Sequence, residues 1–267
     1  MMCPWITAHE VLEDSYGDQE YFYNFVLGEP YNPGDLQVTR STILDAWTPK
    51  KLATDQYFLG VDVGNIKHYA LGSEKGIIKV GRFTKWQDLD DILLMYKPVM
   101  VIDAMPDNTM SRYYVENYLG AYMSFFQENK ANPKALVWWG EDAKNGVVYS
   151  NRNRIIDQMI EEIVQARILF GMPSDREMGE FVKHFETLRR VKVVDNRGIE
   201  SYEWQSTTGV DHFVFACLYY YLATLSKGNG AVFGKVNSDT AKITKQYTSH
   251  EILNLKEVME NNVHLND

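Results

Sequence analysis

Hydrophobic and polar positions over residues 57–126 predict strands interleaved with helices. Residues 57–63, Tyr-Phe-Leu-Gly-Val-Asp-Val, are apolar on both faces apart from one acid, which is typical of a buried central strand. Residues 69–72 and 77–83 predict two further strands joined by a hairpin loop. The pattern then predicts a helix over 87–96, a strand over 99–102, a helix over about 109–119 and a strand near 122–126. This order predicts a mixed sheet with helices on its faces.

Three regions are expected along the chain: a helical lead-in over 1–50, a main domain over 51–226 and a tail over 227–267. The element order of the main domain is that of the RNase H fold. The predicted fold class is therefore α/β, an RNase H-like mixed sheet flanked by helices, with an N-terminal helical lead-in. Further predicted elements are a strand over 135–139, a helix capped by Asn151, edge strands over 167–170 and 191–194 around a helix over 175–188, and an apolar helix over 210–225.

Three aspartates are poorly explained by structural roles alone. Asp62 lies inside the apolar central strand, where burying a lone carboxylate costs several kcal/mol unless it is paired or binds a metal. Asp103 ends the strand over 99–102, at the sheet edge where α/β proteins place ligands. Asp211 heads an apolar stripe of the last helix and is expected to point towards the sheet. The structural alternatives are a pair with Lys67 or backbone N–H groups for Asp62, a helix N-cap for Asp103 and a solvent-facing first-turn acid for Asp211.

Three acids at one sheet edge would repel one another at pH 7 unless cations lie between them. Carboxylate oxygens are ligands that suit Mg²⁺ or Mn²⁺. Two such ions about 4 Å apart can activate a water and stabilise the departing oxygen of a phosphodiester. We therefore expect Asp62, Asp103 and Asp211 to be both the metal ligands and the catalytic residues of a nuclease that uses two ions.

Charge, cysteine content and hydropathy disfavour several other classes of function. The net charge of −9, from 36 acidic and 27 basic residues, argues against a protein that binds nucleic acid over its whole surface. Cys3 and Cys217 belong to no CxxC or Cys/His cluster, which disfavours a disulfide or a zinc site. No run of about 18 apolar residues and no signal peptide are recognised, so a cytoplasmic setting without a membrane is expected.

Three motifs carry a family resemblance: Phe58-Leu-Gly-Val-Asp-Val-Gly64, Val101-Ile-Asp-Ala104 and Gly209-Val-Asp-His-Phe-Val-Phe-Ala216. Together they resemble the C-terminal nuclease domain of the bacteriophage large terminase subunit, and the aromatic stretch 19–30 is similar to the segment joining its ATPase to its nuclease. The resemblance covers roughly residues 5–225. It implies an endonuclease that cuts concatemeric viral double-stranded DNA during packaging in the host cytoplasm. It also implies the terminase small subunit, the portal and an ATPase domain as partners.

The metal-binding acids of that family match Asp62, Asp103 and Asp211. His212 is an auxiliary candidate, although helical geometry turns it about 100° from Asp211. The chain departs from a complete large terminase because it has no GxxxxGK[ST] loop, so we expect a nuclease piece of a larger packaging motor.

Arg152, Arg154 and Lys67 are candidate phosphate contacts, each with solvated surface charge as its alternative. The rival functions are a sugar-kinase or actin-like ATPase, a RuvC-like Holliday-junction resolvase and a packaging scaffold with a decayed site. The ATPase would need a second glycine-rich aspartate loop, which is not found in the sequence. The scaffold would place one of the three acids away from the other two.

Overall fold

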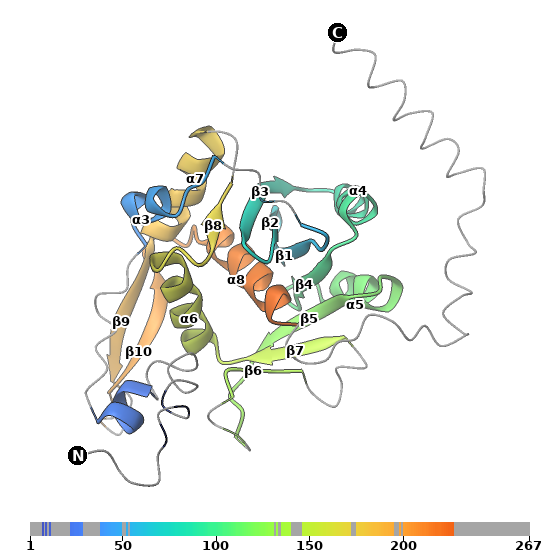
Figure 1. The fold of residues 1–267 in the computed structure, drawn as a ribbon. Helices are drawn as coiled ribbons and strands as arrows, with labels where there is room; N and C mark the ends of the chain where they lie inside the picture. Colours follow the sequence, from blue (N-terminus) through green and yellow to red (C-terminus); the bar gives the residue numbers. More distant parts are fainter. Residues whose placement is uncertain are drawn as a thin grey trace, which may run out of the picture. The chain divides into compact units, whose positions relative to one another are not determined.

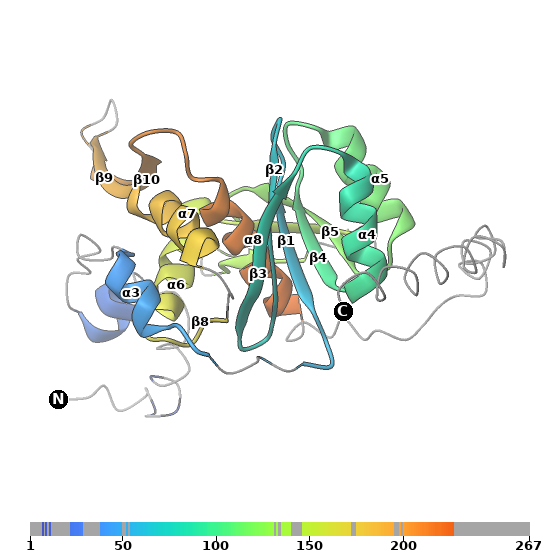
Figure 2. The same ribbon diagram turned by 90° about the horizontal axis from the view of Figure 1, so that it is seen from above.

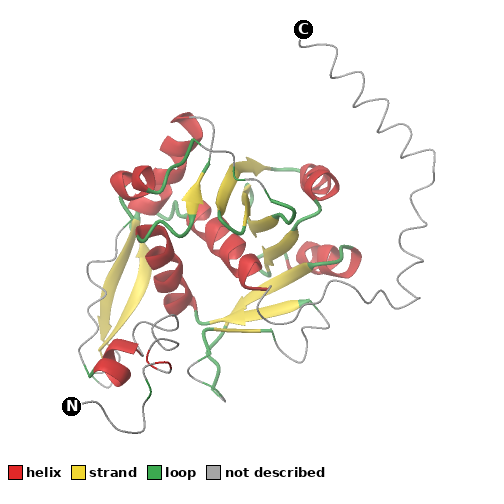
Figure 3. Ribbon diagram, in the orientation of Figure 1, coloured by secondary structure: helices red, strands yellow, loops and turns green. Residues whose placement is uncertain are grey.

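The computed structural model describes residues 22–28, 38–49, 54–130, 135–139, 146–171, 175–194 and 200–226, with residues 7, 9, 11, 52, 132 and 198. The predicted tail over 227–267 lies outside the described residues. The described residues form both helices and strands (Figure 3). The helices are η1 (Phe22–Leu27), α3 (Arg40–Asp45), α4 (Trp86–Tyr96), α5 (Asn108–Asn117), α6 (Arg152–Val164), α7 (Asp175–Glu186) and α8 (His212–Leu225). The strands are β1 (Phe58–Asp62), β2 (Lys67–Ser73), β3 (Gly76–Phe83), β4 (Val99–Asp103), β5 (Ala121–Phe126), β6 (Val137–Trp138), β7 (Val147–Ser150), β8 (Leu169–Phe170), β9 (Leu188–Val194) and β10 (Glu200–Ser206).

An eight-stranded mixed sheet in the order β6-β7-β5-β4-β1-β2-β3-β8 forms the centre of the fold (Figure 1). β1 pairs antiparallel with β2 and parallel with β4. β5 and β7 continue the parallel part, and β3 continues the antiparallel part. The predicted mixed sheet is confirmed, and β1 has the predicted central position, with all five of its residues buried.

Helices cover both faces of this sheet (Figure 2). On one face α8 lies against β1, β2 and β4; α6 and α7 pack against α8, and α3 packs against α6 and α7. On the other face lie α4 and α5. Because neighbouring residues of a strand point to opposite faces, Phe58 and Val101 pack on the α8 side, while Leu59 and Ile102 pack on the α4 and α5 side.

Some elements differ from the sequence prediction. The strand predicted over 191–194 exists as the end of β9, but it is not an edge of the main sheet, because β9 pairs with β10 in a separate two-stranded sheet. Trp204 of β10 anchors this hairpin to α6: its indole Nε1 donates to Asp157 at 2.7 Å and its backbone N–H donates to Asn153 at 3.1 Å. Asp157 also pairs with the buried Arg190. β7, β10 and α3 were not predicted.

Part of the expected lead-in contributes to the core. Val38, Ile43 and Ala46, around α3, are buried in the same cluster as α6, α7 and α8. Trp47 forms a parallel bridge with Phe170 of β8. Residues 38–47 therefore pack with the elements that the sequence assigned to the main domain. Within the described residues no helix is long and apolar enough to cross a membrane.

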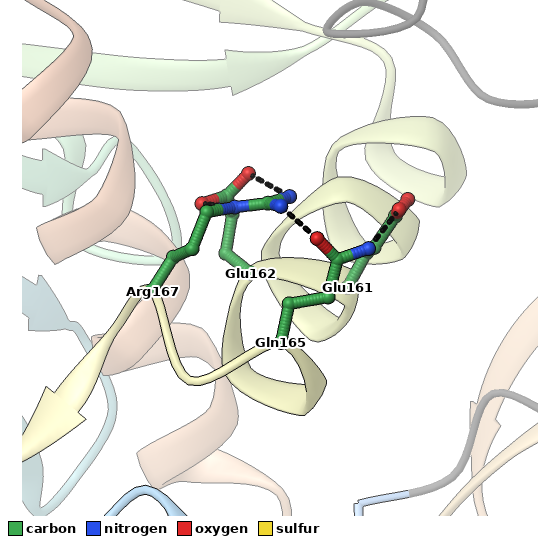
Figure 4. Close-up of polar contacts among 4 residues, drawn as sticks. All are labelled: Glu161, Glu162, Gln165 and Arg167. Carbon is green, nitrogen blue, oxygen red and sulfur yellow. Dashed lines mark hydrogen bonds and ion pairs between the residues drawn. The ribbon is translucent and has the colours of Figure 1, made fainter.

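The turn from α6 into β8 combines a polar cluster with an unfavourable backbone angle. Arg167 donates from Nε and Nη2 to the two carboxylate oxygens of Glu162, at 2.7 and 2.8 Å, and also contacts Gln165 (Figure 4). The amide of Gln165 donates to Glu161 at 2.7 Å. Ala166, between them, has a φ of 52°, the left-handed region that glycine adopts without steric penalty.

We expect Ala166→Gly to stabilise the protein by about 0.5–1 kcal/mol, because it removes the Cβ from a left-handed residue at an exposed position. Thermal denaturation should show a rise in Tm of about 1–4 °C. The control is Ala223→Gly inside α8, where the helix is right-handed and Ala223 is buried, so glycine should destabilise. A loss of stability in both variants would contradict this account.

Candidate functional site

Strand alternation brings Asp62 and Asp103 to the same face and the same edge of the sheet. Asp62 is the last residue of β1 and Asp103 the last of the neighbouring parallel strand β4. Phe58 and Val101, an even number of residues before them, pack on the α8 side, so both carboxylates lie on that side. Asp62 is 7% exposed and Asp103 is half-buried.

The start of α8 lies over this edge. Asp211 is the N-cap of α8, and its side chain makes no capping hydrogen bond. Nδ1 of His212 lies 2.9 Å from Oδ2 of Asp62. The sequence pattern ranked Asp211 above His212, whereas the structure gives His212 the direct contact with Asp62. The reason is the rotation of α8, which turns its Ala216 and Tyr220 backbone towards Gly60 of β1.

Burial and neighbouring acids raise the pKa values of Asp62 and Asp103. For Asp62 burial has the largest effect, the hydrogen bond and charge of His212 lower the pKa, and the charge of Asp211 raises it. For Asp103 burial raises the pKa to about 7, and the charge of Asp62 contributes to the rise. Both carboxylates are therefore costly to ionise in the absence of a cation, and Asp62 interacts electrostatically with both other acids.

Polar neighbours hold Asp103 in place. Its carboxylate accepts a hydrogen bond from the backbone N–H of Met105 at 3.1 Å and another from the Tyr219 hydroxyl. Ser111 donates to its backbone oxygen at 2.6 Å. The N-cap of α5 is Asp107, which accepts from the N–H of Met110, so Asp103 is not used as a helix cap.

We expect the contribution of Asp103 to the stability of the metal-free protein to fall as the pH rises from about 4 to about 7, whereas His68 and His184, whose pKa values are lowered to about 4, contribute in the opposite direction below about pH 6.5. The Asp103 pKa of about 7 lies above the value of about 3.9 for an unfolded chain, so the folded state holds an extra proton between these limits. That stabilising contribution is present in full below pH 4 and is lost as the pH passes 7. Thermal denaturation in EDTA should show that the stability of the wild type relative to Asp103→Asn falls over this pH range, whereas its stability relative to the exposed Asp91→Asn variant does not change. An unchanged slope in the Asp103 variant would contradict the assignment.

Three histidines lie beside the acids. His68 of β2 is directly opposite Asp62 in the β1–β2 register, and its ring stacks on His212 with centroids 4.7 Å apart. Burial, with the charges of His212 and His184, lowers the pKa of His68 to about 4, so its ring is neutral at physiological pH. His184 is also buried, with a pKa lowered to about 4, and its Nδ1 accepts the backbone N–H of Phe213 at 3.1 Å. Donor atoms of Asp62, His68 and His212 lie within 4.8 Å of one another.

Sequence reasoning missed His68 and Tyr219. The signal for His68 was available in the hairpin: a short turn after the central strand places the start of the next strand opposite Asp62. Tyr219 gave no such signal, because it lies among apolar residues on every side of α8.

The predicted basic residues are engaged with protein groups. Lys67 donates to the backbone oxygen of Thr84 at 3.2 Å and lies 4.7 Å from the ring centre of Trp86, on the strand face opposite to His68. Arg152 donates to the backbone oxygen of Trp204 at 2.8 Å and lies over Phe215. Arg154 is half-buried at the start of α6. Their role in binding DNA stays a prediction.

Comparison with known proteins finds similarity at the level of the fold. No protein-family model and no curated protein matches the chain. Among solved structures, the nuclease domain of the large terminase subunit of bacterial virus Sf6 is 9% identical, with 70% of this chain and 97% of that domain covered and a TM-score of 0.51. A mutant of that domain with manganese and beta-thujaplicinol is 10% identical over 70% of this chain and 97% of that one, at 0.49. The large terminase nuclease of thermophilic phage G20c with bound magnesium is 11% identical over 72% and 95%, at 0.36.

The similarity to the Sf6 domain identifies the fold. The eight-stranded mixed sheet flanked by helices is shared with the Sf6 nuclease domain, and the predicted RNase H-like fold class is confirmed. At 9% identity the likeness shows the fold alone, so the chemistry of this chain must be argued from its own residues.

Proposed function

We propose that this chain is the nuclease domain of a bacteriophage large terminase subunit, a metal-dependent endonuclease that cuts concatemeric viral double-stranded DNA during packaging. The observation that carries the proposal is the pair of carboxylates at the ends of β1 and β4. Asp62 and Asp103 share one face of the sheet, their ionisation is opposed by burial, and the start of α8 adds Asp211. This is an arrangement that a divalent cation stabilises.

The residues fit divalent cations. A buried carboxylate that stays ionised needs a cation or several hydrogen-bond donors, and the side-chain contact described for Asp62 is the imidazole of His212, whose pKa Asp62 raises. Asp62, Asp103 and Asp211 would hold Mg²⁺ or Mn²⁺, with two ions expected from the number of carboxylates. When bound, such ions lower the pKa of a coordinated water and stabilise charge on the phosphate. The protein positions the acids and, through Tyr219 and Met105, fixes the orientation of Asp103.

The wider context of the proposal rests on the family. Double-stranded DNA would be the substrate, and an ATPase domain, the small terminase subunit and the portal would be the partners. The place of action would be the host cytoplasm. Arg152, Arg154 and Lys67 are proposed phosphate contacts, and Lys67 and Arg152 would have to exchange their present protein partners for phosphate.

A plasmid-nicking assay tests the proposal. Purified protein should convert supercoiled plasmid to nicked and linear forms with Mn²⁺ or Mg²⁺, and EDTA should abolish the conversion. Absence of cleavage with both metals would refute the nuclease assignment. Two further arms separate the alternatives that share this fold: preference for a four-way junction over linear duplex would favour a resolvase, and binding of ATP would favour a kinase-like protein.

A further inference from the structure

We infer that His68 and His212 donate imidazole nitrogens to the metal centre, so that the site selects a first-row transition-metal dication, such as Mn²⁺ or Co²⁺, over Mg²⁺. The inference rests on the proposed function, because it concerns the metal of the same site. It adds two ligands that lie outside the set of three carboxylates.

The register of β1 and β2 fixes the position of His68 relative to Asp62. Asp62 and His68 are paired residues of the antiparallel strands β1 and β2, so their side chains stand next to each other on one face. That face is the α8 side, since Ala70, two residues after His68, packs there. His68 thus lies beside Asp62 with no intervening residue, and the α8 side of the sheet edge carries both an oxygen and a nitrogen donor.

The Nδ1 atom of His68 is buried without a hydrogen-bond partner in the described part of the chain. The residue is only 5% exposed, and leaving a polar atom buried and unpaired costs about 1–3 kcal/mol. The backbone of Ile66 lies near enough to favour the protonated ring, yet makes no hydrogen bond of normal geometry with Nδ1. Binding of a cation to Nδ1 would offset this cost and would explain why an imidazole lies at this buried position.

His212 completes the donor group. Its ring stacks on that of His68, with an angle of 8° between their planes, and because imidazole lone pairs lie in the ring plane, one ring must turn before both nitrogens can bind one ion; the His212 side chain is 42% exposed and has room to do so. Donor atoms of Asp62, His68 and His212 lie within 4.8 Å of one another. Two ligands of one ion, each at about 2.1 Å from it, lie about 3.0 Å apart when cis and about 4.2 Å apart when trans, so binding an ion would draw these donor atoms together by roughly an ångström.

His184 shows that proximity alone does not make a ligand. Its ring lies 5.7 Å from that of His68, but its Nδ1 is occupied by the backbone N–H of Phe213. It therefore supports α8 from α7 and stays outside the donor group. This makes His184 a matched control for His68, since both are buried histidines in the same cluster.

The chemistry of the donors sets the selectivity. Mg²⁺ prefers oxygen ligands and retains several waters, whereas the affinity of sites that contain nitrogen ligands rises along the first-row transition metals from Mn²⁺, which also accepts carboxylates. A site made of carboxylates alone offers only oxygen ligands, so no nitrogen ligand would favour Mn²⁺ over Mg²⁺ there. Adding two imidazoles should favour Mn²⁺ and Co²⁺.

Electron spin echo spectroscopy of the Mn²⁺-loaded protein tests the inference directly. The wild type should show ¹⁴N modulation from coordinated imidazole. His68→Phe, which keeps the ring volume, should weaken this signal and raise the Kd for Mn²⁺ about tenfold or more, while the Kd for Mg²⁺ changes less than twofold. His212→Asn should weaken the signal as well, and His184→Asn, whose amide oxygen can still accept the backbone N–H of Phe213, should leave both Kd values unchanged.

Absence of ¹⁴N modulation in the wild type, or an equal loss of Mn²⁺ and Mg²⁺ affinity in His68→Phe, would overturn the inference. If His68→Phe does not fold, the wild-type spectrum and His212→Asn still decide. The two proposals fail separately: plasmid cleavage without ¹⁴N modulation refutes the histidine ligands alone, and ¹⁴N modulation without cleavage by any metal refutes the nuclease assignment alone.

Discussion

An Asp62→Asn variant should cut supercoiled plasmid at least about a thousandfold more slowly than the wild type, a loss of about 4 kcal/mol in transition-state stabilisation. Asp62 is the acid that interacts with both of the others and with His212, so it lies at the centre of the proposed metal site. Asparagine keeps the shape of the side chain and can still hydrogen-bond to His212, but it supplies no negative charge. The loss should therefore arise from metal binding and not from misfolding.

Two measurements separate these causes. In EDTA the variant should be at least as stable as the wild type, because a buried carboxylate has been removed. On addition of Mn²⁺ the Tm of the wild type should rise, whereas that of the variant should not. Asp91→Asn, an exposed change on α4, is the control and should match the wild type in both cleavage and Tm shift. Cleavage by Asp62→Asn at more than a tenth of the wild-type rate would contradict the proposed role.

The acids of β1 and β4 could be identified from the sequence because each interrupts or ends an apolar strand. Such a strand is recognisable from a few residues, and an acid within it has few structural explanations. The same local patterns predicted the mixed sheet and its central strand, which the structure confirms. These features depend on residues that are close together in the sequence, so local sequence patterns are sufficient to predict them.

The rotation of α8 could not be predicted in the same way. Residues from Phe213 to Ala223 are apolar almost throughout, and all but Phe215 are buried, so the apolar stripe that Asp211 heads does not by itself mark the side of α8 that faces the sheet. The position of His212 above Asp62 depends on the contact between α8 and β1, which joins residues 150 positions apart. The hairpin of β9 and β10 was misjudged for a related reason, since its place is set by Trp204 and Asp157 on different elements.

That contact between α8 and β1 is made possible by Gly60. A Cβ at this position would overlap the backbone nitrogen of Tyr220 and the carbonyl oxygen of Ala216. These are backbone atoms inside a helix, so they cannot move aside as the end of a flexible side chain can. The absence of a side chain at Gly60 therefore allows the helix to lie close to the strand, and the same closeness places His212 within hydrogen-bonding distance of Asp62.

Gly60→Ala should destabilise the protein by about 3 kcal/mol or more, because the methyl group must push α8 away from β1. Thermal denaturation should show a fall in Tm of roughly 6–12 °C. In whatever fraction stays folded, displacement of α8 should separate His212 from Asp62 and weaken Mn²⁺ binding and plasmid cleavage together. The matched control is Gly179→Ala in α7, where an added Cβ meets nothing within 4 Å, so the change should stabilise the helix by about 0.5–1 kcal/mol. A Gly60→Ala protein with wild-type Tm and cleavage would show that the spacing between α8 and β1 does not determine the geometry of the site.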